Sequence, residues 1–341
     1  MKDTWESLFK KEAKKQGHSD TFIQECIGYA AKLHANNVPV IFDFKHLSAI
    51  FDMESRDLFF MCKHLGQQYT TYSIKKKSDP KAIRLLTAPG WQLKKIQLCI
   101  LRNILMRDNS VSEHAHGFVR KKSIVTNAKA HEGARWILCM DLKDFFGTVR
   151  KGKVYDYFES LGYEKSVVET LATLCTYENH LPQGAPTSPC LSNLMAKGMD
   201  EEIEAYSEQN GFVYTRYADD ITISSKTDIK PEKNTINAIV RKHGFRVNHD
   251  KTKLRHNGQR MEVTGLTVGR GVHVPKAYKK AILRELNFCK VHTPSKHSAT
   301  LYPDKMFYKE WLLGKIQYVR SIDQSAGDKM LEQFNELNWI L

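Results

Sequence analysis

The stretch Phe212-Val-Tyr-Thr-Arg-Tyr-Ala-Asp-Asp-Ile-Thr-Ile-Ser224 carries the pattern that decides the fold. Apolar and polar residues alternate on both sides of Ala218-Asp219-Asp220, which predicts two antiparallel strands joined by a tight turn. Adjacent carboxylates in such a turn repel each other, and each raises the pKa of the other unless a cation neutralises them. A solvated Asp-Asp turn is the plainer alternative, but the apolar strands on both sides favour a turn fixed against a core.

A second apolar run supplies a third carboxylate. Trp136-Ile-Leu-Cys-Met140 has the composition of a buried strand, and Asp141 follows it directly. Carboxylates at strand ends suit Mg²⁺, whose other ligands are water and phosphate oxygens. Two such ions about 3.5–4 Å apart activate an attacking hydroxyl and stabilise a leaving pyrophosphate. The pattern therefore predicts a triphosphate substrate.

The composition indicates a globular chain with a polyanionic partner. The 341 residues include 52 Lys and Arg against 38 Asp and Glu, a net charge of +14, and 41% are hydrophobic, which excludes a mainly disordered or collagen-like chain. The excess is concentrated, because residues 61–130 contain 14 Lys and Arg but only 3 acids. A regional excess of this size favours a surface that follows phosphates over a merely solvated face.

A membrane is the weaker choice of partner. Residues 96–106 form the most apolar stretch, but Arg102 interrupts it and it is too short to span a bilayer. No apolar segment follows Met1, so secretion is not expected. The seven cysteines are dispersed without a Cys-x-x-Cys pair, which suits reduced thiols. We expect a cytoplasmic protein with neither a zinc site nor a disulfide framework.

Three motifs in order give the chain a family resemblance. Tyr217-Ala-Asp-Asp220, Asp141-Leu-Lys-Asp-Phe-Phe146 and Leu181-Pro-Gln-Gly-Ala-Pro-Thr-Ser-Pro189 resemble the catalytic boxes of reverse transcriptases. Asn127-Ala-Lys-Ala-His131 and Val263-Thr-Gly265 are similar to hallmarks of the bacterial retron reverse transcriptases, which belong to the group II intron-like superfamily. The resemblance runs from about Tyr69 to Val268.

The resemblance implies an α+β fold, a right-hand polymerase with an antiparallel palm sheet flanked by helices. A helical N-terminal extension would occupy residues 1–65, and the helical spacing of apolar residues there agrees with it. Fingers and palm would occupy residues 66–268. A helical, RNA-binding thumb would occupy residues 269–341.

The resemblance also implies roles at the reaction centre. Asp141, Asp219 and Asp220 would bind two Mg²⁺ ions, with the backbone carbonyl of Leu142 as a further oxygen ligand. Lys251 matches the position proposed to protonate the departing pyrophosphate. Simple steering of phosphate by its charge is an equally open alternative for Lys251.

A second set would surround the incoming nucleotide. Phe146 matches the bulky residue that selects deoxynucleotides by clashing with a ribose 2′-hydroxyl. Core packing is the alternative for Phe145 and Phe146, and we expect one of the two rings to select deoxynucleotides and the other to pack in the core. The other implied nucleotide-binding residues are Lys81, Arg84, Asp144 and Gln183, while the choice among Lys75, Lys76 and Lys77 as a helper stays open.

A third set would contact the template and primer. Gly184 would let backbone approach closely, and Gly265 would permit close contact with a nucleic-acid backbone. His131 would help to position structured RNA, with a helix cap or core hydrogen bond as the alternative. Val119 stands where intron-type enzymes often carry a base-covering Arg, so either Arg120 takes that role or it is lost. The full set is Arg120, Lys121, Lys122, Asn127, His131, Gly184, Tyr217, Val263, Thr264 and Gly265.

The implied function is RNA-directed DNA synthesis by a retron enzyme. A cognate non-coding RNA would be both template and primer, and extension of a guanosine 2′-hydroxyl would give branched RNA–DNA (msDNA). The basic residues 270–341 would grip a stem-loop of that RNA through shape and phosphates. Partners would be the RNA and msDNA, dNTPs, a separate effector or toxin protein in anti-phage defence, and a host RNase H for template removal.

Two alternatives stay open. One is an intron-type or other defence reverse transcriptase with a different primer, against which Asn127-Ala-Lys-Ala-His131 argues. The other is a catalytically silent RNA-binding scaffold. The three aspartates argue against a scaffold, since it has no need of mutually repelling carboxylates.

Overall fold

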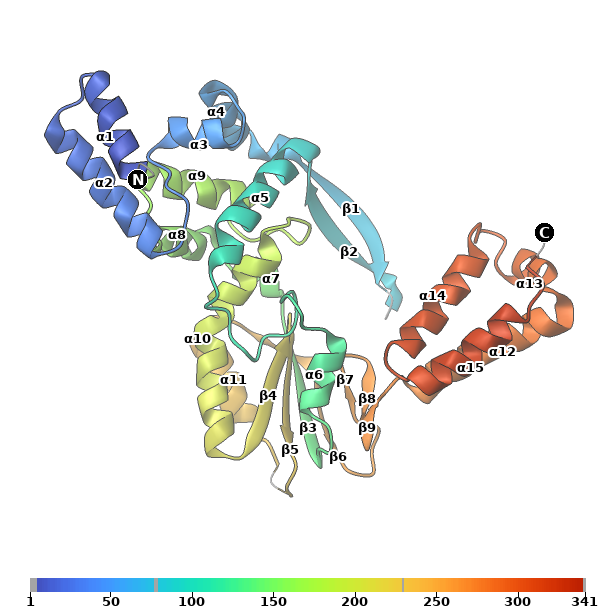
Figure 1. The fold of residues 1–341 in the computed structure, drawn as a ribbon. Helices are drawn as coiled ribbons and strands as arrows, with labels where there is room; N and C mark the ends of the chain where they lie inside the picture. The colour runs from blue at the N-terminus through green and yellow to red at the C-terminus, as the bar shows by residue number, and fades with distance from the viewer. Residues whose placement is uncertain (1–4, 77–78, 229, 340–341) are drawn as a thin grey trace. The chain divides into compact units, whose positions relative to one another are not determined.

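The computed structural model describes residues 5–76, 79–228 and 230–339, which form two compact units (Figure 1). Unit 1 comprises Met1–Glu113, Lys143–Glu201 and Val240–Arg246. Unit 2 comprises His114–Leu142, Glu202–Ile239 and Val247–Leu341. Each unit is therefore assembled from segments that are distant in the sequence.

Unit 1 is mainly helical. Local caps start several of its helices; for example, Ser19 accepts a hydrogen bond from the Phe22 amide and Asp43 accepts one from the His46 amide. Its strands β1 and β2 form an antiparallel two-stranded ribbon. Its elements are α1 Trp5–Lys15, α2 Asp20–Ala35, α3 Phe44–Ile50, α4 Ser55–Lys63, β1 Tyr69–Lys76, β2 Asp79–Pro89, α5 Trp91–Asn103, α7 Phe145–Thr148, α8 Lys151–Ser160 and α9 Lys165–Cys175, with short 3-10 helices at Leu65–Gln68 and Leu105–Arg107.

Unit 2 is built on a four-stranded antiparallel sheet in the order β4-β5-β3-β6. These strands are β3 Trp136–Leu142, β4 Phe212–Tyr217, β5 Asp220–Ser225 and β6 Val247–His256. The inner strands β3 and β5 are buried along most of their length, and β3 has the almost continuous apolar sequence that such burial favours. Helix α6, Ile124–Ala130, packs on β4. Helices α10 Ser188–Gln209 and α11 Lys233–Lys242 each run from one unit into the other.

A smaller sheet and four helices complete unit 2. The sheet has the order β7-β8-β9, with β7 Glu262–Val263, β8 Leu266–Gly269 and β9 Gly271–His273. The helices are α12 Lys276–His292, α13 Pro294–Leu301, α14 Tyr308–Arg320 and α15 Gln324–Asn335. One continuous apolar core joins β7–β9 to α12, α14 and α15.

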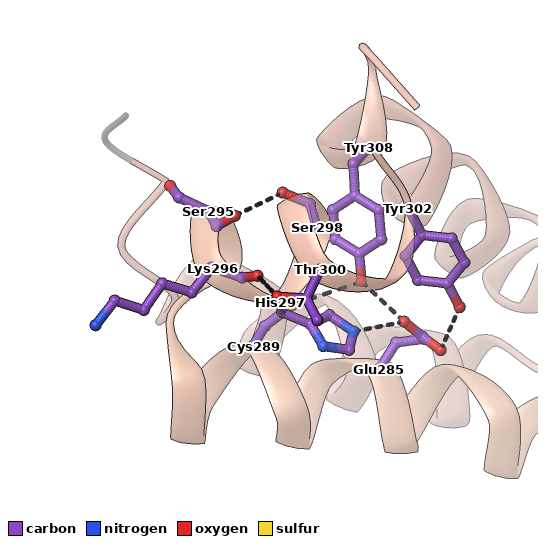
Figure 2. A network of polar contacts seen from close by, with 9 residues as sticks. All are labelled: Glu285, Cys289, Ser295, Lys296, His297, Ser298, Thr300, Tyr302 and Tyr308. Carbon is purple, nitrogen blue, oxygen red and sulfur yellow. Dashed lines mark hydrogen bonds and ion pairs between the residues drawn. The ribbon is translucent and has the colours of Figure 1, made fainter. Parts of the chain in front are cut away.

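A buried carboxylate ties three of the C-terminal helical segments together (Figure 2). Glu285 of α12 is 6% exposed and accepts hydrogen bonds from the hydroxyls of Tyr302 and Tyr308, each at 2.9 Å. His297 of α13 lies 2.9 Å from the same carboxylate through Nε2. Burial raises the pKa of Glu285, but the hydrogen bonds from these three partners outweigh it and hold the pKa below its usual range. The ionised Glu285 therefore braces α12 against α13 and the start of α14.

The observed elements confirm the predicted α+β class with an antiparallel sheet, helices before it and helices after it. The division into residues 1–65, 66–268 and 269–341 stays a prediction. None of the helices in the described part of the chain has the length and apolar character that crossing a bilayer requires.

Candidate active site

The Asp219–Asp220 bend joins β4 to β5 and is held from three sides. Ala218 has a φ of +56°, an unusual backbone conformation for a residue with a side chain. Its carbonyl accepts a hydrogen bond of 2.9 Å from Nη1 of Arg216, a fully buried side chain. The carbonyl of Asp219 accepts one of 2.8 Å from the Leu142 amide of β3. The bend is therefore pinned to both neighbouring strands.

Gly117 closes the third side of the bend. A Cβ atom at this position would lie 2.3 Å from the Ala218 nitrogen and 3.0 Å from the Tyr217 carbonyl carbon. Only glycine permits so close an approach of two backbones. The segment that contains Gly117 is held in turn by β4, since the His116 amide donates to the Arg216 carbonyl at 2.7 Å.

Asp141 stands beside the bend, as the strand pattern predicts. It ends the apolar run of β3 and pairs directly with Asp220 across the β3–β5 ladder. Its side chain is largely buried, and its Oδ1 lies 2.6 Å from Nζ of Lys251 on β6. The pairing of β3 with β6 shifts register just there, which aims Lys251 at the carboxylate.

The carboxylates at the bend repel one another, and a bound cation would relieve this repulsion. The pKa of Asp220 is raised to about 6, first by burial and then by the charges of Asp219 and Asp141, while Lys251 opposes the rise. Among the described residues, no group of three His, Cys, Asp or Glu side chains is already arranged to coordinate a metal ion. The three carboxylates nevertheless fit a divalent ion by charge and by donor type, since all their oxygens are hard ligands.

A cavity of about 440 Å³ lies next to these carboxylates. Asp141 and Asp220 line one part of it, together with Tyr217, whose pairing with Asp220 closes the β4–β5 turn. Lys251 and Thr264 line another part. The full lining contains three cationic side chains, those of Lys251, Lys253 and Arg255, and three carboxylates, those of Asp141, Asp220 and Glu262. Cations beside carboxylates are the combination that a phosphate bound through a metal requires.

The Val263-Thr264-Gly265 segment forms the tight β7–β8 turn. Val263 pairs with Leu266, and the two turn residues have φ values of +47° and +78°, which is typical of a type I′ hairpin. Gly265 therefore meets a backbone requirement of the turn, and a Cβ there would touch nothing. Val263 is 1% exposed, so its side chain packs in the core, while the role of this segment in binding nucleic acid stays a prediction.

Asn127 and His131 on α6 are also buried completely. Nδ1 of His131 lies 2.7 Å from Oγ of Ser224, and Nε2 lies 2.7 Å from Oγ1 of Thr215. Burial lowers the pKa of His131 to about 3, so the ring is neutral at physiological pH. His131 has the core hydrogen bonds that were the alternative, and the role of these two residues in positioning RNA stays a prediction. It braces α6 against the two strands that carry the aspartate pair.

Three basic residues precede α6. Arg120 and Lys121 are exposed and Lys122 is half-buried. Their side chains therefore retain the solvent access that phosphate contacts need.

The remaining predicted residues lie in unit 1. Phe145 is 4% exposed and packs on Phe245 at 5.6 Å between ring centroids, whereas Phe146 keeps part of its surface, and its role in nucleotide selection stays a prediction. Asp144 and Gln183 are exposed. The side chains of Lys81 and Arg84 on β2 lie outside the described part of the structure, as does residue 77 in full.

Gly184 does permit a close backbone approach, but the approaching backbone is that of β2. A Cβ at Gly184 would lie 2.6 Å from the Thr87 carbonyl oxygen, to which the Gly184 amide donates at 3.0 Å. The close backbone approach expected at Gly184 is thus made by β2 within unit 1, and a contact of Gly184 with nucleic acid stays a prediction.

Sequence reasoning missed Arg216 and assigned no role to Gly117. Phe212, Tyr214 and Arg216 alternate on one buried face of β4, with 8%, 2% and 0% exposure. A cation at an apolar position of the strand was the signal that could have found Arg216. Gly117 gave no such signal, because its need for a missing Cβ arises from a segment a hundred residues away.

Comparison with known proteins agrees with this geometry. A family model described as reverse transcriptase (RNA-dependent DNA polymerase) matches residues 74–268. The retron Ec86 reverse transcriptase of Escherichia coli is 33% identical over 272 residues, which cover 79% of this chain and 81% of that protein. The retron Mx65 and Mx162 reverse transcriptases of Myxococcus xanthus are 31% and 32% identical, covering 77% and 79% of this chain. The chain spans 64% and 61% of their lengths.

Among solved structures, telomerase from Candida albicans in complex with a TWJ fragment of telomeric RNA aligns with 79% of this chain and 63% of its own, at a TM-score of 0.45 and 12% identity. The family model spans more than half of the chain, and the similarity to Ec86 spans most of both proteins. The antiparallel sheet with flanking helices agrees with the right-hand polymerase fold of that family. The pairing of Asp141 with Asp220 across adjacent strands is consistent with these similarities. The match to the family model and the similarity to Ec86 show that the chain belongs to the retron reverse transcriptases, a group of RNA-dependent DNA polymerases.

Proposed function

We propose that this protein copies part of a cognate structured RNA into DNA by nucleotidyl transfer at Asp141, Asp219 and Asp220. The observation that carries the proposal is the pairing of Asp141 with Asp220 across two buried strands, next to a cavity that also contains Lys251. Such an arrangement has no structural advantage, since like charges in a half-buried site destabilise the fold. Its value is the binding of cations.

Asp141, Asp219 and Asp220 would hold two Mg²⁺ ions, with the Leu142 carbonyl as a further ligand. When bound, the ions supply a lowered pKa for the attacking hydroxyl and charge neutralisation for the leaving pyrophosphate. Lys251 now binds Asp141 at 2.6 Å, which keeps its ammonium group within reach of a phosphate at the same place. We assign Lys251 the protonation or the steering of that phosphate.

Selection of the nucleotide falls to unit 1. Phe146 would exclude a 2′-hydroxyl, because its ring is half-buried and accessible to a nucleotide, whereas the ring of Phe145 is buried. Gln183 and Asp144 would contact the nucleotide through exposed polar groups. Lys81 and Arg84 would hold the triphosphate.

The retron family supports a particular template and product. We propose that the cognate non-coding RNA primes synthesis from a guanosine 2′-hydroxyl and that the product is branched msDNA. Residues 269–341 would grip a stem-loop of the RNA. Removal of the template by a host RNase H, and a separate effector protein in anti-phage defence, complete the proposal.

The test of the chemistry is the double variant Asp219→Asn, Asp220→Asn. It should abolish DNA synthesis while RNA binding survives, because both substitutions remove charge and leave the size of the side chains unchanged. Asp156→Asn, an exposed change on α8, is the matched control and should behave as the wild type. Measurable primer extension by the double variant would contradict the assignment of the aspartates.

The test of the substrate is to purify the protein from its native host and to sequence the nucleic acid that accompanies it. A short single-stranded DNA joined to RNA is expected. Linear DNA extended from a 3′ end would instead favour the intron-type alternative, while RNA without any DNA would favour a scaffold.

A further inference from the structure

Helices α1, α2 and α3 of unit 1 form an apolar groove that the polymerase reaction does not use. The groove has a volume of about 710 Å³, within the range of sites that bury a sizeable ligand. Phe9, Ala13, Phe22, Cys26, Tyr29 and Phe42 supply its apolar lining. Phe22 is 43% exposed, a large apolar area for a side chain on the surface.

The floor of the groove is preformed. The rings of Phe9 and Phe42 stack at 5.8 Å, and Tyr29 lies 5.9 Å from Phe42. The Tyr29 hydroxyl donates to the Ile41 carbonyl at 2.9 Å and accepts from the Glu164 amide at 2.9 Å. A ligand would therefore bind without having to order these rings, which favours affinity.

The lining has the opposite charge to the chain as a whole. Four carboxylates, those of Glu12, Glu25, Asp43 and Glu164, line the groove against one ammonium group, that of Lys45. The full chain has a net charge of +14. This local reversal of sign excludes nucleic acid as the occupant, because its phosphates would be repelled.

Two of the carboxylates are fixed in place. Asp43 caps α3 by accepting a hydrogen bond of 2.7 Å from the His46 amide, and Glu164 caps α9 by accepting one of 2.8 Å from the Ser166 amide. Hydrogen bonds from Ser166 hold the pKa of Glu164 below its usual range, so it is ionised at neutral pH. Glu12 is 3.7 Å from exposed Lys15, a weak pair that a partner could replace.

We propose that this groove docks a cationic amphipathic helix of a partner protein. The apolar face of such a helix would lie on the Phe9–Phe42 floor, as in other helix-in-groove complexes. Its Lys and Arg side chains would meet the four carboxylates at the rim. The site is separate from the polymerase reaction and adds a protein-binding surface to it.

The experiment uses the full chain and two synthetic helical peptides of about 18 residues, or five turns. Both carry leucine on one face, and the other face is lysine in one peptide and glutamate in the other. Fluorescence anisotropy should show saturable binding of the lysine peptide and no binding of the glutamate peptide. Glu12→Lys with Glu25→Lys should raise its Kd about tenfold or more, because each reversal turns an attraction into a repulsion. Phe22→Ser should weaken the same peptide while preserving the charge.

The matched control is Glu132→Lys with Asp156→Lys, which makes the same change in charge at exposed positions outside the groove. It should leave the Kd within about twofold of the wild type, since surface charges beyond a Debye length are screened. Equal weakening by both double variants, or equal binding of both peptides, would overturn the proposal. Sedimentation should show no self-association, and a dimer that the groove variant disperses would assign the groove to a second copy of the chain. DNA synthesis is measured on the same samples and should be unchanged, so the two proposals fail independently.

Discussion

Gly117→Ala is the perturbation that tests most directly whether the catalytic bend is fixed by its surroundings. The added Cβ would stand 2.3 Å from the Ala218 nitrogen and 3.1 Å from the Ala218 Cα, both backbone atoms of the bend. Ordinary van der Waals contact begins at 3.4 Å. The two backbones must therefore separate by roughly 1 Å, and no side-chain rotation can relieve the contact.

The bend is expected to move together with the aspartates. Gly117 cannot retreat without breaking the hydrogen bond of 2.7 Å from the His116 amide to the Arg216 carbonyl, which ties its segment to β4. A misplacement of about 1 Å in a reacting geometry costs on the order of 100-fold in rate, equivalent to about 2.7 kcal/mol of activation free energy. We therefore expect kcat for nucleotide addition to fall about 100-fold.

The assay is single-turnover incorporation of one dNTP on a primed RNA template, with a thermal melt to confirm folding. Gly28→Ala is the matched control, because a Cβ there would meet nothing within 4 Å and α2 should tolerate alanine better than glycine. A folded Gly117→Ala protein with kcat close to that of the wild type would refute the reasoning, since it would show that the bend is free to adjust.

Three further outcomes follow from the electrostatics. The pKa of Asp220 is about 6 against an ordinary value of 3.8, so divalent-ion affinity and DNA synthesis should both fall as pH drops through 6. Without metal, the folded chain keeps a proton on Asp220 between pH 3.8 and 6 that the unfolded chain loses, so the stability of the fold should decline as pH rises through that window. A flat pH dependence of activity or of stability would contradict the respective prediction. Lys251→Met should lower kcat while Lys251→Arg restores part of it, which a rapid-quench measurement checks; equal activity of the two variants would show that the charge next to Asp141 is not used. Glu285→Gln should cost about 1–3 kcal/mol of unfolding free energy, because an amide cannot accept from all three buried donors, and an unchanged melt would show that they find other partners. The stabilisation by ionised Glu285 should be lost as pH falls through its lowered pKa.

The catalytic strands could be predicted because their signals are local. The alternation around Asp219-Asp220 and the apolar run before Asp141 each depend on neighbours a few residues away. The order of the motifs then placed both in one sheet. The helices of the N-terminal 65 residues and of the C-terminal segment were predictable for the same reason.

At several motif positions the structure supplies a reason for the residue type that the sequence did not reveal. The close approach of strand β2 requires a glycine at position 184, and the turn geometry favours one at position 265. Val263 and His131 are buried, so the core accounts for both side chains, and their expected roles in binding nucleic acid stay predictions. A motif records that a residue is required, and it does not say whether a core or a ligand requires it.

The sequence by itself determined the strands, the carboxylates that end them and the family to which the chain belongs, because these follow from short-range patterning and ordered motifs. Only the tertiary structure decided how the aspartate bend is held. The guanidinium of Arg216 below the Ala218 carbonyl, the missing Cβ at Gly117 and the ammonium of Lys251 on Asp141 come from segments that meet only after folding. The same is true of the acid-rimmed groove, since its charges come from four separate segments and no window of sequence contains them together.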